Sequence, residues 1–297
     1  MSNKTIIFIP GKNPKPPAQA HTDLLKRTLL EGLRRADPTL AEPLAMQLDF
    51  RLIAWNLIYY DVEKDPARDL LWIDNLINTH GPSDEDIKQA NSWHKKLIRL
   101  SYSIADLLPQ LLRLMPREIR ENAEGLKRYF QNSDNVACKI RALLKQAIIE
   151  AEEQGNEILL IGHSMGSVIA YDTLWELSHE EHNNTKVDLL TLGSPLGMRY
   201  VQRRLQGYEQ TGRQRYPNNI RTWNNLSSVG DVVAVDRHFH DDFAEMLELG
   251  VIERIEDHCE GIYNYFHNEQ GLNCHRSYGY LVNPAVGSLI ANWWQKN

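Results

Sequence analysis

The sequence predicts an α/β fold, with a mostly parallel central sheet that has helices on both of its faces. Three observations predict it. Short apolar runs bounded by glycine and proline are typical of buried strands. Between them lie longer segments whose apolar residues recur at helical spacing, and strands that alternate with helices form parallel sheets. The length of 297 residues, 42% of them hydrophobic, fits one domain with an inserted segment. We therefore expect a single domain over residues 1–297.

The first sixty residues predict a β-α-β opening. Thr5–Ile9 is a compact apolar run that ends at Pro10-Gly11, as a buried strand feeding a loop does. His21–Arg35 carries leucines at helical spacing, which predicts a helix. Leu48–Tyr60 is again apolar and aromatic, in the manner of a strand.

Residues 61–135 predict a helical cap inserted into the α/β domain. The segment is polar-rich and has two apolar stripes at helical spacing, the second being Leu97–Met115. This second stripe contains arginine and aspartate, which are costly in hydrocarbon, so we do not expect it to span a membrane. The pattern leaves open whether the cap is a structural layer or a mobile lid.

The second half of the chain continues the alternation of strands and helices and ends in a helix capped by Asn283 and Pro284. The expected helices are Val136–Gln154 and Ser167–Ser178, and the expected strands are Glu157–Ile161, Val187–Leu192 and Asn219–Leu226.

Composition excludes several classes of function. A net charge of −6 gives no long-range attraction to nucleic acid. The N-terminal apolar run is too short for a signal-peptide core, so we expect a cytoplasmic protein. The cysteines are odd in number and unpaired in spacing, which predicts free thiols. His238–Asp242 is the best candidate for a metal site, but its spacing matches no strong zinc pattern, so we expect neither metal nor cofactor.

The motif that carries chemistry is Gly162-His163-Ser164-Met165-Gly166. A bare Gly-x-Ser-x-Gly arises by chance in roughly one chain in ten of this length. Here, however, an expected strand enters the motif and an expected helix leaves it, which is the turn that lifts a serine hydroxyl above a sheet edge. Ser164 is therefore predicted to be a nucleophile.

Residues 158–174, ILLIGHSMGSVIAYDTL, resemble the nucleophile elbow of lipase- and esterase-like α/β-hydrolases. The turn Leu192–Gly197 also resembles the equivalent turn of intracellular phospholipase-like members, including the DDHD group. These two short segments carry the resemblance. It implies a catalytic triad in the order serine, acid, histidine, with the later two on loops after later strands.

The sequence offers residues in that order. Asp231 follows the strand Asn219–Leu226, where the carboxyl end of a parallel strand presents catalytic groups, and Asp236 is the alternative acid. His275 lies in the loop before the last helix and is the expected base, with His258 and His267 as alternatives.

The resemblance also implies an oxyanion hole made of backbone N–H groups. One donor is expected from Met165, the residue after the nucleophile. The second is expected from Gly11 or Lys12, in the loop where many relatives carry His-Gly. Pro10 cannot serve because proline has no N–H.

The function implied is a serine hydrolase that acts on carboxylic esters, including lipid esters, through an acyl-enzyme. An acyltransferase using the same serine, and a catalytically inactive binding module with this fold, remain as alternatives. The expected partner is a small-molecule or lipid acyl ester, and peripheral membrane contact through the apolar stripe Leu97–Met115 stays open.

Overall fold

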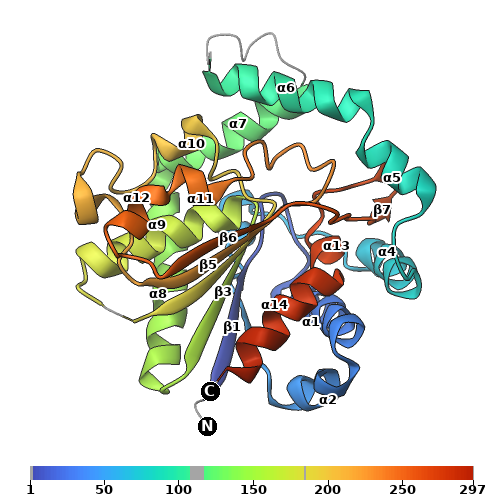
Figure 1. The fold of residues 1–297 in the computed structure, drawn as a ribbon, viewed down its shortest axis with the longest axis horizontal. Helices are drawn as coiled ribbons and strands as arrows, with labels where there is room; N and C mark the ends of the chain where they lie inside the picture. The colour runs from blue at the N-terminus through green and yellow to red at the C-terminus, as the bar shows by residue number, and fades with distance from the viewer. Residues whose placement is uncertain (1–2, 108–116, 184, 297) are drawn as a thin grey trace.

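The computed structural model describes residues 3–107, 117–183 and 185–296. Its centre is a sheet of six parallel strands in the order β2-β1-β3-β4-β5-β6 (Figure 1). The expected α/β class is therefore confirmed, and the central sheet is parallel throughout. The strands are β1 (Lys4–Ile9), β2 (Asp49–Leu52), β3 (Glu157–His163), β4 (Val187–Leu192), β5 (Ile220–Leu226) and β6 (Arg254–His258).

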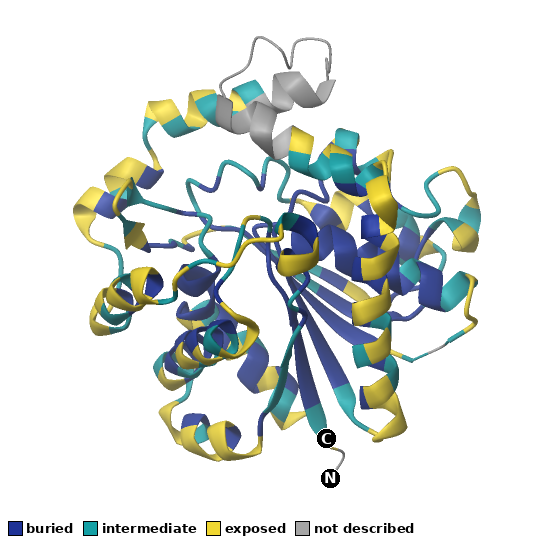
Figure 2. Cartoon of the chain, turned by 180° about the vertical axis from the view of Figure 1, so that it is seen from behind, coloured by how far each residue is buried: buried dark blue, intermediate teal, exposed yellow. Residues whose placement is uncertain are grey.

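Helices cover both faces of this sheet because its strands are apolar on both sides. Along β1, Ile6 and Phe8 belong to one core cluster, and Ile7 and Ile9 to the other. The buried strands form the dark centre of Figure 2. The first cluster includes side chains of α1 (Ala18–Ala36), α13 (Ser277–Leu281) and α14 (Pro284–Gln295), and the second those of α8 (Val136–Glu153) and α9 (Met165–His179).

A helical segment is inserted between β2 and β3, as the sequence predicts. In Figure 1 α6 runs across the top of the molecule, beyond the end toward which β1 points. Residues 108–116 of the apolar stripe Leu97–Met115 lie outside the described residues. Within the described ranges, no helix is long and apolar enough to cross a membrane. The helices of the insertion are α4 (Ala67–Asn78), α5 (Asp84–Ala90), α6 (Trp93–Leu107) and α7 (Arg117–Phe130).

The prediction of one strand-like run over Leu48–Tyr60 is wrong in its second half. The strand β2 ends at Leu52, and a short helix, α3 (Asn56–Tyr60), follows. The buried Trp55 explains the change, because its indole N–H donates to the carbonyl of Pro10, 2.9 Å away, and this turns the chain across the end of β1. A short apolar run does not by itself distinguish strand from helix.

Other elements have no counterpart in the sequence analysis. They are α2 (Pro38–Gln47), α10 (Arg199–Gln202), α11 (Phe239–Asp242), α12 (Ala244–Glu248), strand β6, and an antiparallel ribbon of β7 (His267–Asn268) and β8 (Gly271–Leu272). The ribbon lies just before the loop that carries His275, so it sets the point from which that loop departs.

The strand order creates a switch point between β1 and β3. These two strands are neighbours in register, with Ile9 opposite Gly162. The helices that follow them, α1 and α9, pack in the two different core clusters, on opposite faces of the sheet. In open parallel sheets, ligands bind in the crevice that this divergence opens beyond the carboxyl ends of the strands.

Candidate active site

Ser164 occupies a strained turn at the switch point, between β3 and α9. Its backbone has φ 53° and ψ −125°, a region that residues other than glycine rarely adopt. The turn is secured because the Ser164 N–H donates to the carbonyl of Leu192 at 2.9 Å, while the Ser167 hydroxyl donates to the Ser164 carbonyl at 2.6 Å. Strain of this kind persists where the surroundings fix it, and it is frequent at functional sites.

The glycines of the motif are required by close backbone contacts. A β-carbon on Gly162 would lie 2.7 Å from the Cα of Ser167, and one on Gly166 would lie 2.1 Å from the carbonyl oxygen of Ile9. Both distances are shorter than real contacts of a β-carbon. The spacing of small residues around Ser164 therefore follows from how closely α9 approaches β1 and β3.

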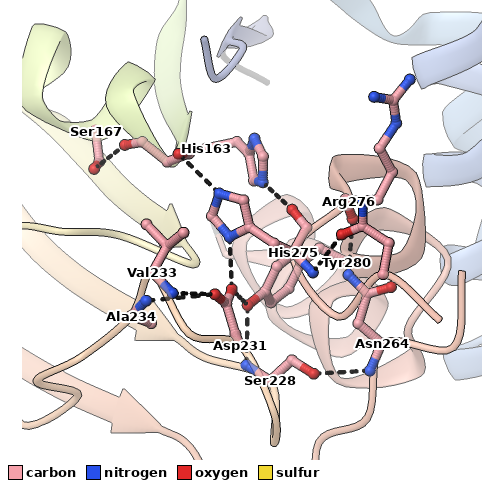
Figure 3. Close-up of polar contacts among 12 residues, drawn as sticks. His163, Ser167, Ser228, Asp231, Val233, Ala234, Asn264, His275, Arg276 and Tyr280 are labelled. Atoms are coloured by element: carbon pink, nitrogen blue, oxygen red, sulfur yellow. Dashed lines mark hydrogen bonds and ion pairs between the residues drawn. The ribbon is translucent and has the colours of Figure 1, made fainter. Parts of the chain in front are cut away.

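The structure brings Ser164, His275 and Asp231 together in one hydrogen-bonded chain. Figure 3 labels His275 and Asp231 and marks the bond between them. His275 Nε2 lies 2.9 Å from Ser164 Oγ, and His275 Nδ1 lies 2.8 Å from Asp231 Oδ2. An ionised Asp231 can accept but not donate, so the proton of the neutral imidazole resides on Nδ1. The lone pair of Nε2 then faces the serine hydroxyl and can take its proton.

Asp231 is buried yet held in its ionised form. Burial alone would raise its pKa, but the interactions with His275 and with the Tyr280 hydroxyl lower it from 3.8 to about 2. Tyr280 donates to Asp231 Oδ2 at 2.5 Å, and the backbone N–H of Val233 donates to Oδ1 at 2.9 Å. The Tyr280 oxygen accepts in turn from the backbone N–H of Ser228 at 3.0 Å.

His163, inside the motif, supports the backbone of His275. Its Nε2–H donates to the His275 carbonyl at 2.7 Å, and the two rings lie 4.9 Å apart. Burial, reinforced by the neighbouring His275, holds the pKa of His163 well below its usual range. His163 is therefore a neutral donor that holds the backbone of the loop at His275.

The loop after β1 lies against Ser164. A β-carbon on Gly11 would come within 2.9 Å of the Ser164 β-carbon, so this position must be glycine. Asn56 of α3 holds the loop by donating to the carbonyls of Gly11 and Asn13, each at 2.9 Å. Lys12 follows Gly11 directly, and its side chain approaches Gly125 of α7.

Met165 is the first residue of α9. The unbonded N–H groups and the positive dipole at a helix N-terminus favour negative charge. The three expected oxyanion-hole residues, Met165, Gly11 and Lys12, thus lie in the two segments that adjoin Ser164.

Gly193 is a further contact of the site, in the turn Leu192–Gly197. Its φ is +54°, and a β-carbon there would lie 2.6 Å from Asp231 Oδ2 and 3.1 Å from His275 Nδ1. A side chain at this position would displace the pair. The turn Leu192–Gly197 therefore borders Asp231 and His275.

The alternative residues bond elsewhere. The Asp236 carboxylate accepts from the backbone N–H of His238, His258 Nε2 lies 3.0 Å from the Asn224 side-chain oxygen, and His267 Nε2 lies 2.6 Å from Asp86. For the metal candidate His238–Asp242, the described part of the chain contains no group of three or more ligands able to hold an ion.

Several residues that shape the site were not predicted from the sequence: His163 in its supporting role, Tyr280, Trp55, Asn56 and Gly193. His163 and Gly193 lie within or beside motifs already identified, and that position was the available signal. Tyr280, Trp55 and Asn56 carry no local signal.

Comparison of the chain with protein-family models, with curated proteins and with solved structures finds no match.

Proposed function

We propose that this protein is a serine hydrolase of the α/β-hydrolase type that cleaves carboxylic esters. The observation that carries the proposal is the hydrogen-bonded chain from Ser164 through His275 to Asp231, with Ser164 strained at the switch point of the sheet. Three side chains from three separate loops meet in the order and geometry that nucleophilic catalysis requires.

The mechanism follows from the positions of these groups. His275 Nε2 takes the Ser164 proton as the serine oxygen attacks the ester carbonyl, and Asp231 stabilises the imidazolium that forms. The resulting oxyanion is stabilised by the backbone N–H of Met165 and by that of Gly11 or Lys12, each donor contributing about 3 kcal/mol. His275 then protonates the departing alcohol, and water releases the acyl group by the same steps in reverse.

The proposal extends to lipid esters because the inserted helices expose large apolar side chains. Leu71 on α4 is 60% exposed, and Trp93 and Leu100 on α6 are 72% and 54% exposed. Such side chains suit an apolar acyl chain or peripheral contact with a membrane surface.

Labelling with a fluorophosphonate tests the nucleophile. We expect the wild-type protein to be labelled and to hydrolyse p-nitrophenyl esters, and Ser164→Ala to lose labelling and to lose roughly 10⁵-fold in kcat/KM. Ser178→Ala is the matched control, since Ser178 lies at the other end of the same helix and bonds the Trp175 carbonyl. Folded wild-type protein that neither labels nor turns over esters would identify a binding module instead.

Analysis of the products of the ester assay separates hydrolysis from acyl transfer. If water accepts the acyl group, the free acid is the product whatever alcohol is added. If glycerol or another added alcohol becomes acylated in preference to water, the enzyme is an acyltransferase that uses the same serine.

A further inference from the structure

A cavity of about 180 Å³ borders His275. Gly230 and Val232, which flank Asp231, form one wall, and the ribbon β7–β8 with the loop leading to His275 forms another. Lys95 of α6 closes it from the inserted helical segment. The cavity is thus built from the loops that carry the acid and the base and from the insertion.

The reaction chemistry decides which part of a substrate would lie here, and this step rests on the proposed function. When the tetrahedral intermediate collapses, protonated His275 must pass its proton to the alcohol oxygen, because an alkoxide is a poor leaving group. The C–O bond to the alcohol breaks, the proton on Nε2 moves to that oxygen, and the carbonyl re-forms on Ser164. The alcohol portion therefore leaves beside His275.

The cavity is too small to enclose a long alkyl chain, and polar surface makes up slightly more than half of its lining. Water takes about 30 Å³ per molecule in the liquid, so the volume corresponds to a few such molecules or to one compact polar group. Asparagine, glutamine and glycine make up half of the lining residues, and the aliphatic side chains among them are Val232 and Leu272. An apolar alcohol would gain little from burial here.

The charged groups of the lining have one sign. Lys95 is half-buried, and within the described ranges no carboxylate lies within ion-pair distance of its ammonium. The nearby carboxylates are occupied, Asp86 by His267 and Asp231 by His275. Burial raises the pKa of the Cys274 thiol to about 11, so this lining residue is neutral. Ionised Asp231 offsets the charge of protonated His275, so Lys95 supplies the net positive charge that faces the alcohol.

We infer that this cavity binds the alcohol portion of the substrate and that the alcohol is small, polar and anionic, bearing a phosphate or a carboxylate near Lys95. The acyl portion lies on the opposite side of the scissile bond. The substrate class is then an acyl ester of an acidic alcohol, and Lys95 selects it through charge.

Four butyryl esters that differ in the alcohol test the inference: glycerol, glycerol 3-phosphate, glycolate and choline. We expect kcat/KM for the phosphate or carboxylate ester to exceed that for the glycerol ester by about tenfold, as expected for one partly screened charge pair. The choline ester should be the poorest substrate. The preference should shrink as salt is added, because ions screen it.

Substitution of Lys95 connects the preference to the cavity. Lys95→Met should reduce the ratio of anionic to neutral kcat/KM about tenfold, and Lys95→Arg should retain it. Lys96→Met is the matched control, since Lys96 is the next residue on α6, exposed and outside the cavity lining. The melting temperatures of all three variants report whether each one is folded.

The outcomes separate the inference from the proposed function. Hydrolysis of the glycerol and anionic esters at equal rates, or a ratio unchanged in Lys95→Met, overturns the inference and leaves the hydrolase intact. Fluorophosphonate labelling of Ser164 without turnover of any of the four esters also overturns the inference and leaves the hydrolase intact. Absence of both labelling and turnover overturns the proposed function. A preference confined to the phosphate or to the carboxylate supports the inference and identifies the anion.

Discussion

At the scale of single residues, the site depends on how firmly Asp231 is held. Its carboxylate accepts from His275, from the Tyr280 hydroxyl and from the backbone N–H of Val233. Hydrogen bonds to a charged acceptor in a buried place contribute more than those at a surface. Tyr280 also accepts from Ser228, so one hydroxyl joins the acid to the loop that carries it.

Removing that hydroxyl tests its role as a positioning group. Tyr280→Phe leaves the ring in place but deprives Asp231 of a donor and Ser228 of an acceptor, so we expect kcat to fall about tenfold, equivalent to about 1.4 kcal/mol. The pH–rate profile should change as well, because Asp231 then holds His275 less firmly. Tyr216→Phe removes a hydroxyl that donates to the carboxylate of Glu245 instead, at 2.7 Å, and it serves as the control. A wild-type kcat and pH profile in Tyr280→Phe would contradict the assignment.

The sequence identified the three residues that form the chain of hydrogen bonds, but it did not identify the residues that hold these three in place. Ser164 lies in a motif, and Asp231 and His275 follow strands in the expected order, so local pattern and chain order were sufficient. Tyr280 and Asn56 act across long separations in sequence, on Asp231 and on the Gly11 loop. No spacing rule connects such partners, because tertiary packing brings them together.

At the scale of elements, the inserted helix α4 is tied to the loop of His275. Asp69 of α4 is 2% exposed and bonds Arg276, the residue after His275, at 2.6 Å. It also bonds Lys64 at 2.8 Å and the Tyr278 hydroxyl at 3.2 Å. The insertion is thereby part of what positions His275.

Breaking this tie should affect both stability and turnover. Asp69→Ala leaves two cations without their shared carboxylate, and we expect a loss of about 3 kcal/mol in the free energy of unfolding together with reduced kcat/KM. Asp74→Ala on the same helix is the control, since its pair with Arg27 is about half exposed and should contribute less than about 1 kcal/mol. Urea unfolding and ester assays measure both. Equal effects of the two substitutions would show that α4 does not hold the His275 loop.

Elements were predictable where they are long or apolar. The pattern predicted β4 with its observed bounds, and β1, β3, β5, α1, α8 and α9 to within a few residues. It missed β6, because Arg254–His258 is an edge strand with one buried residue, Ile255, and therefore shows no apolar run. The ribbon β7–β8 has two residues in each strand, which is too short for any period to show.

At the scale of the whole molecule, acid should destabilise the fold. The pKa values of Glu31, Asp69, Asp86, Asp188 and Asp231 all lie below their ordinary range, because ion pairs and hydrogen bonds outweigh the opposing effect of burial. A carboxyl whose folded pKa is lowered stabilises the protein fully above its unfolded pKa, near 4. That contribution is lost as the pH falls toward the folded pKa.

Urea midpoints between pH 7 and pH 3 measure this dependence. Burial raises the pKa of Asp172 and of Asp242 to about 7, so we expect the midpoint to rise as the pH falls from 7 toward 5. Below pH 4 we expect a steep decline, to which Asp231 alone contributes about 2 kcal/mol. Asp188→Asn should be less stable than wild type at pH 7 and should lose less on acidification, since it removes a carboxylate whose pKa is lowered by its bond with Arg221. Stability that rises below pH 4 would contradict the linkage.

The position of β1 also governs how the chain is made. β1 lies between β2 and β3, and its register with β3 joins segments about 150 residues apart, with the inserted helices between them. A ribosome adding roughly 5–20 residues per second needs about 10–30 s to reach the end of β3. Throughout that interval one edge of an apolar strand has no partner, and such edges are prone to aggregate. The inserted segment therefore lengthens the period in which this strand edge is exposed in the nascent chain.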